Sequence, residues 1–209
     1  MFNKKEISTG YFSKDAIPIK VKITRKIPDG VYVWIELERL GHVFWSIHQG
    51  RNITVYTYGR YDDVEMWGFT GEGVLIKYVG SLAKTYIKEK LYPKNNAPSM
   101  VYKINDVNPQ KILEVSDKLW FSSDERPDRE DKENRIKTYG KVINDYNLLV
   151  RNCTTMTINV LEDSGSNIFW DFELDPVSPH GLFIQLDVKA KMKNNVENYT
   201  DIMKSIIRE

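Results

Sequence analysis

The sequence predicts one domain that mixes strands and helices, and three observations support this prediction. The 209 residues fit a single domain that is long enough to bury a core. Hydrophobic residues make up 41% of the chain and aromatic residues 12%, which is typical of globular proteins. Apolar and polar residues alternate in the first half, as in strands, whereas Asn108-Pro109 in the second half is a good helix start.

Strands are predicted mainly in the first half of the chain. Residues 17–23 and 31–37 alternate on either side of the turn Pro28-Asp29-Gly30, which favours an antiparallel hairpin with one buried face. A segment rich in aromatic and β-branched residues follows at 42–47, and residues 48–52 are predicted to form the next loop. Further strands are predicted at 53–58, 74–79 and 100–104.

Helices are predicted at three places. Ser81 is a candidate cap for a helix over 82–91, and Asn108-Pro109 begins a second helix that runs to Trp120. A C-terminal helix is expected over 196–207. The intervening segment at 122–134 is dense in charges of both signs, so we expect an exposed, solvated loop there.

The charge balance and the absence of targeting motifs narrow the expected location and partners. With 30 basic and 29 acidic residues, nothing directs the chain toward nucleic acid, which is not expected as a partner. The N-terminus lacks the apolar run of a signal peptide, and no apolar stretch approaches the length of a bilayer-spanning helix. We therefore expect synthesis as a soluble cytoplasmic chain without stable membrane insertion, and a non-classical route if the protein is secreted.

The motifs of common cofactors and metals are missing. There is no GxGxxG, GKS/GKT or GxSxG motif and no HExxH or CxxC, so no cofactor and no metal is expected. His42 and His48 lie six residues apart in one predicted strand, roughly 20 Å from each other, which is too far to share an ion. His48 is interpreted as a loop-edge residue and His180 as a turn residue. The five tryptophans are interpreted as core or rim residues.

Cys153 is the one cysteine of the chain, so no internal disulfide forms. Such a residue is either a buried small apolar side chain or a nucleophile that works with a distant histidine. Asn152 is a preferred helix N-cap, and a helix that begins there would place Cys153 where the helix dipole favours a thiolate. The alternation in TMTINV at 155–160 instead favours a strand. If the helix forms, Gly165 is a candidate for its end.

The segments GHVFWSI at 41–47, TYG at 57–59 and YNLLVRNCT at 146–154 resemble the circularly permuted branch of the NlpC-type papain-like cysteine hydrolases. These segments cover about a quarter of the chain. In that branch a histidine on a strand precedes a cysteine that opens a helix. The resemblance implies an α+β fold, with a central antiparallel sheet and packed helices in one papain-like domain over 1–209. It also decides between the two interpretations of 155–160 in favour of a helix.

The resemblance assigns roles to particular residues. It implies Cys153 as the nucleophile, His42 as its base, and backbone N–H groups at the helix start beside Asn152 as the oxyanion site. It also implies a polar third residue that orients the imidazole. If Ile47 pairs with Ile53, Tyr58 lies opposite His42 and is the candidate, whereas a shift of one residue favours Thr57.

The resemblance implies that the protein hydrolyses an amide bond. The leading expectation is a peptidoglycan peptidase or amidase. The relatives include secreted cell-wall amidases and antibacterial effectors of type VI secretion, so an immunity protein is an expected partner and a target-cell periplasm an expected site of action. Two alternatives stay open. One is a lipid acyltransferase, thioesterase or host-protein-directed enzyme with the same dyad. An apolar channel would favour a lipid substrate, and a polar open cleft would favour a peptide. The other is a non-catalytic binding module.

Overall fold

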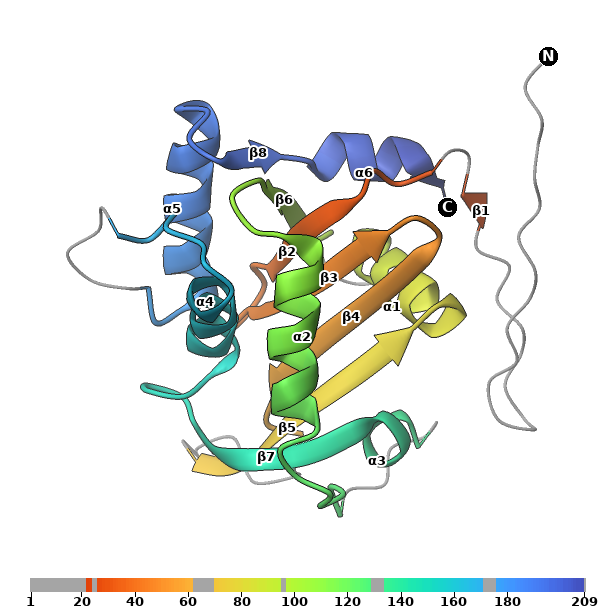
Figure 1. Ribbon diagram of the computed structural model, residues 1–209, viewed down its shortest axis with the longest axis vertical. Helices are drawn as coiled ribbons and strands as arrows, with labels where there is room; N and C mark the ends of the chain where they lie inside the picture. Colours follow the sequence, from red (N-terminus) through yellow and green to blue (C-terminus); the bar gives the residue numbers. More distant parts are fainter. Residues whose placement is uncertain are drawn as a thin grey trace.

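The chain forms a seven-stranded, fully antiparallel sheet with helices on both faces (Figure 1). The computed structural model describes residues 22–23, 26–61, 70–94, 97–128, 134–170 and 176–208. In spatial order, the strands are β7 (Gly140–Asn147), β5 (Thr70–Val79), β4 (Asn52–Gly59), β3 (His42–Gln49), β2 (Gly30–Glu36), β6 (Met100–Ile104) and β8 (Val196–Asn198). The short strands β1 (Lys22–Ile23) and β9 (Ile207–Arg208) pair with each other.

The helices lie in two layers that enclose the sheet. The helices that pack on one face are α2 (Pro109–Trp120), α4 (Cys153–Asp163) and α5 (Pro179–Lys191). Those that pack on the other face are α1 (Ser81–Leu91), the short α3 (Arg135–Tyr139) and α6 (Thr200–Ile206). The architecture is therefore α+β with a central antiparallel sheet, as the sequence predicts.

Strand β2 shows how the sheet separates two hydrophobic cores. Val31, Val33 and Ile35 face the core beneath α2, α4 and α5. Tyr32 and Trp34 face the core beneath α1 and α6. All five side chains are fully buried, so the prediction of a strand with one buried face is wrong. Its odd and even positions are all bulky because helices cover both faces of the sheet.

The predicted hairpin between 17–23 and 31–37 is wrong in the part that the structure describes. Lys22–Ile23 pairs with Ile207–Arg208 at the C-terminus, and residues 17–21 lie outside the described residues. Strand β2 pairs instead with β3 and β6. Alternation within a segment identifies a strand but not its partner, because any strand of the same pattern satisfies the same faces.

The second half of the chain agrees with the prediction in part. The helix that begins at Asn108-Pro109 is confirmed, with the Asn108 side chain accepting a hydrogen bond from the backbone N–H of Gln110. Helix α5 was not predicted. The expected helix over 196–207 is instead β8, α6 and β9 in succession. Of the charged loop expected at 122–134, residues 123–128 form neither helix nor strand, and 129–133 lie outside the described residues.

Candidate active site

Helix α4 begins at Cys153, and Asn152 caps it. The Asn152 side chain accepts hydrogen bonds from the backbone N–H groups of Thr154 and Thr155, at 2.8 and 3.1 Å. The Thr155 hydroxyl in turn accepts from the backbone N–H of Asn152, which completes a capping box. The helix prediction is thus confirmed, and Gly165 follows its end with φ of 95°.

The strand-like alternation at 155–160 has a physical explanation. Seven of the eleven residues of α4 are buried, because the helix lies between the sheet, α2 and α5. Apolar residues therefore occur on most sides of the helix and hide its 3.6-residue period. The β-branched Thr157 fits within the helix because its hydroxyl donates to the carbonyl of Cys153 at 2.8 Å.

Asn152 also joins two loops beside the cysteine. Its amide nitrogen donates to the carbonyl oxygens of Leu148, at 2.7 Å, and Val177, at 2.9 Å. These carbonyls belong to the loop before α4 and the segment before α5. With only 2% of its surface exposed, Asn152 is a buried structural link as well as a helix cap.

The Cys153 thiol lies at the buried end of α4, with 6% of the residue exposed. Burial raises the pKa of this thiol above its ordinary value, while backbone N–H groups of Val43, Thr154 and Cys153 itself and the Thr154 side chain favour the thiolate. The expectation of a lowered thiol pKa is therefore wrong, because desolvation outweighs these donors. The Val43 interaction places the sulfur beside the residue that directly follows His42 in β3.

His42 is the first residue of β3, and Thr57 on β4 holds its ring. The Nε2 atom lies 2.6 Å from the Thr57 hydroxyl oxygen. The hydroxyls of Tyr61 and Tyr86 lie 3.1 and 3.4 Å from the same oxygen. Burial and, next, the positive charge of Lys90 hold the His42 pKa well below its ordinary 6.5. The imidazole is thus neutral near pH 7, the state in which it accepts a proton.

Tyr58 does not take the role predicted for it. Its hydroxyl donates to Asn144 Oδ1 at 2.6 Å, and its ring belongs to the core beneath α4. The expected pairing of Ile47 with Ile53 is wrong, since Ile47 pairs with Thr54. The turn between β3 and β4 is only two residues long, so the register shifts by one and Thr57 comes to the His42 side of the sheet.

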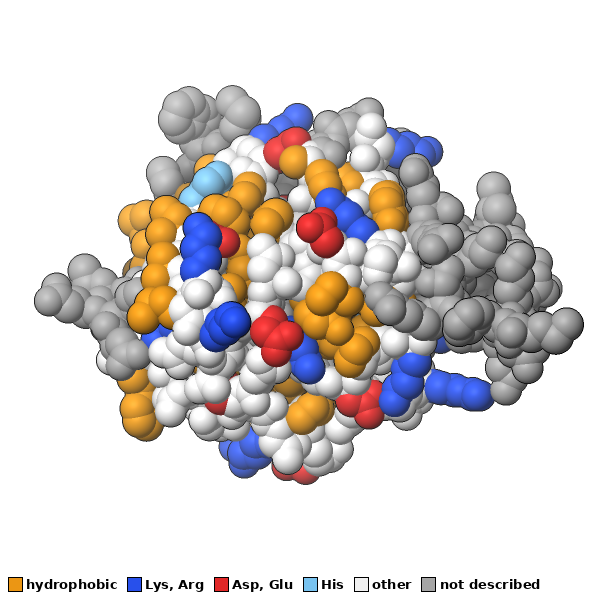
Figure 2. Space-filling model, turned by 90° about the horizontal axis from the view of Figure 1, so that it is seen from above, with side chains coloured by type: hydrophobic (Ala, Val, Ile, Leu, Met, Phe, Trp, Pro, Cys, Tyr) orange, Lys and Arg blue, Asp and Glu red, His pale blue; other side chains and the backbone are white. Residues whose placement is uncertain are grey.

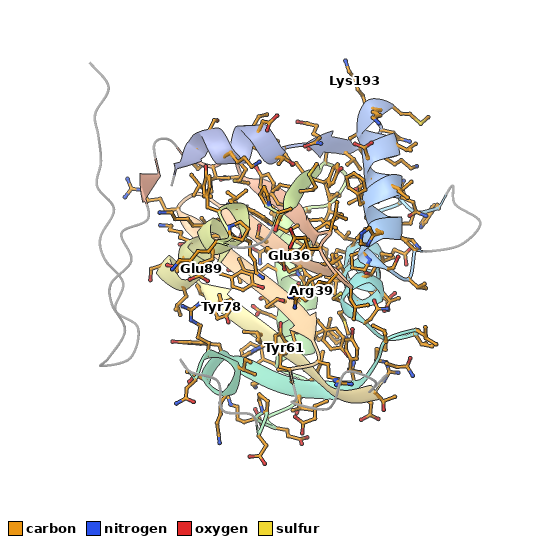
Figure 3. All side chains as sticks on the ribbon, turned by 180° about the vertical axis from the view of Figure 1, so that it is seen from behind. Glu36, Arg39, Tyr61, Tyr78, Glu89 and Lys193 are labelled. Carbon is orange, nitrogen blue, oxygen red and sulfur yellow. The ribbon has the colours of Figure 1, made fainter. Side chains whose placement is uncertain are left out.

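His42 and Cys153 line the same pocket, which has a volume of about 840 Å³. Its size falls in the range of sites for small molecules. Figure 3 labels three of the residues that line this pocket, which are Glu36, Tyr61 and Tyr78. Half of the 22 lining residues are aliphatic or aromatic. These are Leu40, Tyr61, Ile76, Tyr78, Tyr86, Ile136, Tyr146, Leu148, Leu149, Val177 and Pro179.

An ion pair lies in the wall of this pocket. Lys90 on α1 donates to both carboxylate oxygens of Glu36, at 2.8 and 2.9 Å. The ammonium group also lies 5.4 Å from the centre of the Tyr86 ring. Lys90 thus connects α1 to the end of β2 and brings a positive charge close to His42.

The other histidines lie elsewhere, and the interpretations of both need correction. His48 is not at a loop edge. It lies inside β3 with 1% exposed, and its Nε2 atom is 2.9 Å from the Ser46 hydroxyl. His180 belongs to the first turn of α5 rather than to a turn segment. Across the described parts of the chain, no group of three His, Cys, Asp or Glu residues could hold a metal ion.

The tryptophans differ in environment. Trp34 and Trp45 are fully buried in the two cores, as interpreted, and Trp120 packs against Lys141 with its ring centre 4.3 Å from the ammonium group. Trp170 is 76% exposed. Trp67 lies outside the described residues.

On the expectation that His42 acts as a catalytic base, replacing Thr57 with valine should lower kcat by about ten- to a hundredfold, with little change in KM. Valine has the shape of threonine but no oxygen to hold His42 Nε2. Thr57→Ser keeps the oxygen and should restore most of the rate. Steady-state kinetics of both variants tests this role, and equal losses in the two would contradict it.

His48, which is fully buried, and His42, which is partly buried, should make folding stability sensitive to mild acid. Burial lowers the pKa of His48 from 6.5 to about 3, and the pKa of His42 is lowered in the same direction. The two histidines therefore bind protons in the unfolded chain at pH values where they stay neutral in the folded chain. The free energy of unfolding falls as pH drops below about 6.5. Denaturant titrations between pH 7 and 5 should show uptake of about two protons on unfolding, and about one in His48→Gln. If the change in the free energy of unfolding with pH is the same in His48→Gln as in wild type, this prediction is contradicted.

Comparison with known proteins identifies no relative: no protein-family model, no curated protein and no solved structure matches this chain. Within the described residues, no helix has the length and hydrophobicity needed to cross a bilayer.

Proposed function

We propose that this protein is a cysteine hydrolase in which Cys153 attacks a carbonyl group and His42 acts as its base. The observation that carries the proposal is that both residues line one pocket. Cys153 reaches it from the capped start of α4, and His42 reaches it from the start of β3. Thr57, which contacts His42 Nε2, supplies the third, orienting group of the site.

The resting pair is neutral in this proposal. The Cys153 thiol has a raised pKa and the His42 imidazole a lowered one, so neither is charged near pH 7. In this proposal Nε2 carries the proton and donates it to the Thr57 hydroxyl oxygen 2.6 Å away, which leaves Nδ1 as the basic nitrogen. Attack and proton transfer then occur together: the S–H proton moves to His42 as the sulfur bonds to the carbonyl carbon.

Backbone N–H groups at the start of α4 stabilise the charge on the carbonyl oxygen during the attack. The N–H of Cys153 is at the positive end of the helix dipole, where it supports an oxyanion. The protonated His42 gives its proton to the leaving amine, alcohol or thiol as the carbonyl–leaving-group bond breaks. Water then attacks the thioester, with His42 again as base, and releases the acid and the free thiol.

The lining of the pocket favours an apolar acyl group. Eleven aliphatic and aromatic residues surround the space next to Cys153 and His42. Such a surface gains free energy by covering apolar parts of a substrate. A thioester, ester or amide of an acyl chain is therefore the substrate class that the lining supports best.

A peptide amide, including a peptidoglycan stem peptide, is the second candidate substrate. The Glu36–Lys90 ion pair and Arg135 in the pocket wall favour it, since they offer charged partners to a polar chain. In this version the protein is an antibacterial effector, which an immunity protein would block in the producing cell.

The test of the proposal is detection of an acyl-enzyme on Cys153. The purified protein would be mixed with nitrophenyl esters of short and medium acyl chains and with stem-peptide amides, and its intact mass followed. We expect an adduct of the acyl mass that maps to Cys153. Cys153→Ala should form none, whereas His180→Ala, which changes a histidine outside the pocket, should behave like wild type. No adduct with any of these substrates, or an adduct on another residue, would contradict the proposal.

A further inference from the structure

Large apolar side chains project into solvent around the mouth of the pocket. Leu40 lies in the β2–β3 loop and is 75% exposed, and Leu149 and Val150 lie in the β7–α4 loop and are 66% and 73% exposed. Val177, just before α5, is 53% exposed. We call these four residues the apolar rim. Three of them also line the pocket, so the rim continues directly into its apolar interior.

Hydrogen bonds hold two of the rim loops at this place. Asn152 donates to the carbonyls of Leu148 and Val177, so the β7–α4 loop and the segment before α5 are joined beside Cys153. Asn147 holds the base of the β7–α4 loop, because its side-chain oxygen accepts from the N–H groups of Leu149 and Val150, at 3.0 and 3.2 Å. The rim is therefore presented by a fixed backbone.

Basic residues flank the apolar tips. Arg39 precedes Leu40, and Arg151 follows Val150, and both arginines are exposed. Glu38, the acidic neighbour of Arg39, accepts a hydrogen bond from the backbone N–H of Ala97. Apolar tips with adjacent arginines match the two layers of an anionic lipid surface, in which acyl chains lie beneath negatively charged headgroups.

We propose that the apolar rim, with Arg39 and Arg151, docks the protein on an anionic lipid surface with the pocket mouth facing the acyl chains. The rim then reaches the apolar layer while the arginines stay among the headgroups. This docking goes beyond the proposed hydrolysis and does not require Cys153 to react. It would also spare an acyl substrate from crossing water on its way into the pocket.

The same molecule offers a matched control surface. On α5, Ile184 and Val188 are 61% and 43% exposed, and Met192 at the end of that helix is 69% exposed. Figure 2 shows hydrophobic side chains gathered on the side of the molecule where α5 lies. These residues do not line the pocket. They are equally apolar but are expected to take no part in docking.

Flotation of the full-length protein with vesicles tests the proposal. Wild type should bind vesicles of mixed phosphatidylcholine and phosphatidylglycerol more tightly than vesicles of phosphatidylcholine alone. Leu40→Ser with Leu149→Ser should weaken binding by about tenfold or more, because each side chain loses apolar burial. Arg39→Gln with Arg151→Gln should remove the preference for anionic vesicles. Ile184→Ser with Met192→Ser should bind like wild type, and so should Cys153→Ala.

Three results would overturn the docking proposal. The first is no binding to either vesicle, and the second is an equal loss in the rim and α5 variants. The third is that the rim substitutions reduce self-association in sedimentation experiments but leave vesicle binding unchanged. This result would indicate that a second copy of the chain occupies the rim. Because Cys153→Ala is expected to bind, failure of docking is distinguishable from failure of the proposed hydrolysis.

Discussion

Replacing His42 with alanine should lower kcat/KM for the hydrolysed substrate by about 10²- to 10⁴-fold, the contribution typical of a positioned general base. The loss should lie mainly in kcat, since the apolar lining that we propose as the binding site of the acyl group is unchanged. Cys153→Ala should abolish turnover altogether. Stopped-flow or steady-state kinetics with the best substrate from the acyl-enzyme experiment measures both effects.

Two further variants distinguish the catalytic role of His42 from a structural one. His42→Gln fills a similar volume but takes no proton at neutral pH, so it should be nearly as slow as the alanine variant. His180→Ala should retain the wild-type rate, because His180 is on α5 and does not line the pocket. A His42→Gln variant with near wild-type kcat would show that His42 is not the base.

Replacing Asn152 with alanine should lower the free energy of unfolding by about 2–4 kcal/mol. The loss of the N-cap accounts for about 1 kcal/mol of this, and the carbonyls of Leu148 and Val177 lose their donor. The variant should also lose activity, since the start of α4 positions Cys153. Chemical denaturation with parallel kinetics measures the two effects.

Asn152→Asp is the matched control for that experiment. Its carboxylate still accepts from the N–H groups of Thr154 and Thr155, so most of the helix cap should survive. It does not donate to Leu148 and Val177, and its negative charge beside Cys153 raises the thiol pKa further. We expect a smaller loss of stability than in Asn152→Ala together with slower acylation. Equal stability losses in both variants would mean that the cap contributes little.

The sequence predicts much of the fold because its local signals are strong. Segments 42–47, 53–58, 74–79, 82–91 and 100–104 are all strands or helices of the expected kind. The cap at Asn152 and the helix start at Asn108-Pro109 are confirmed, because a single side chain and its local backbone define them. The pairing of the strands needs information on partners distant in sequence, and this is where the hairpin of 17–23 with 31–37 is wrong.

The candidate site shows the same division between local and distant information. The cap at Asn152 is a local feature, but the local alternation at 155–160 favours a strand, and only the resemblance favours the helix that the structure shows. Thr57 depends on the register of β3 with β4, which the length of one turn decides. Tyr86 and Lys90 come from α1, and no spacing in the sequence connects that helix with His42. The direction of the Cys153 pKa depends on its burial, which the helix dipole alone does not reveal.

The proposed pairing of Cys153 with His42 is tested by the rate of thiol alkylation across pH. Iodoacetamide would be added to wild type and to His42→Gln between pH 5 and 10, and modification of the only cysteine followed by mass. Wild type should react at least about tenfold faster near pH 7, because His42 accepts the thiol proton as the sulfur attacks. The two rates should converge at high pH, where the thiol ionises without help. Equal rates in both proteins at every pH would show that His42 does not act on Cys153.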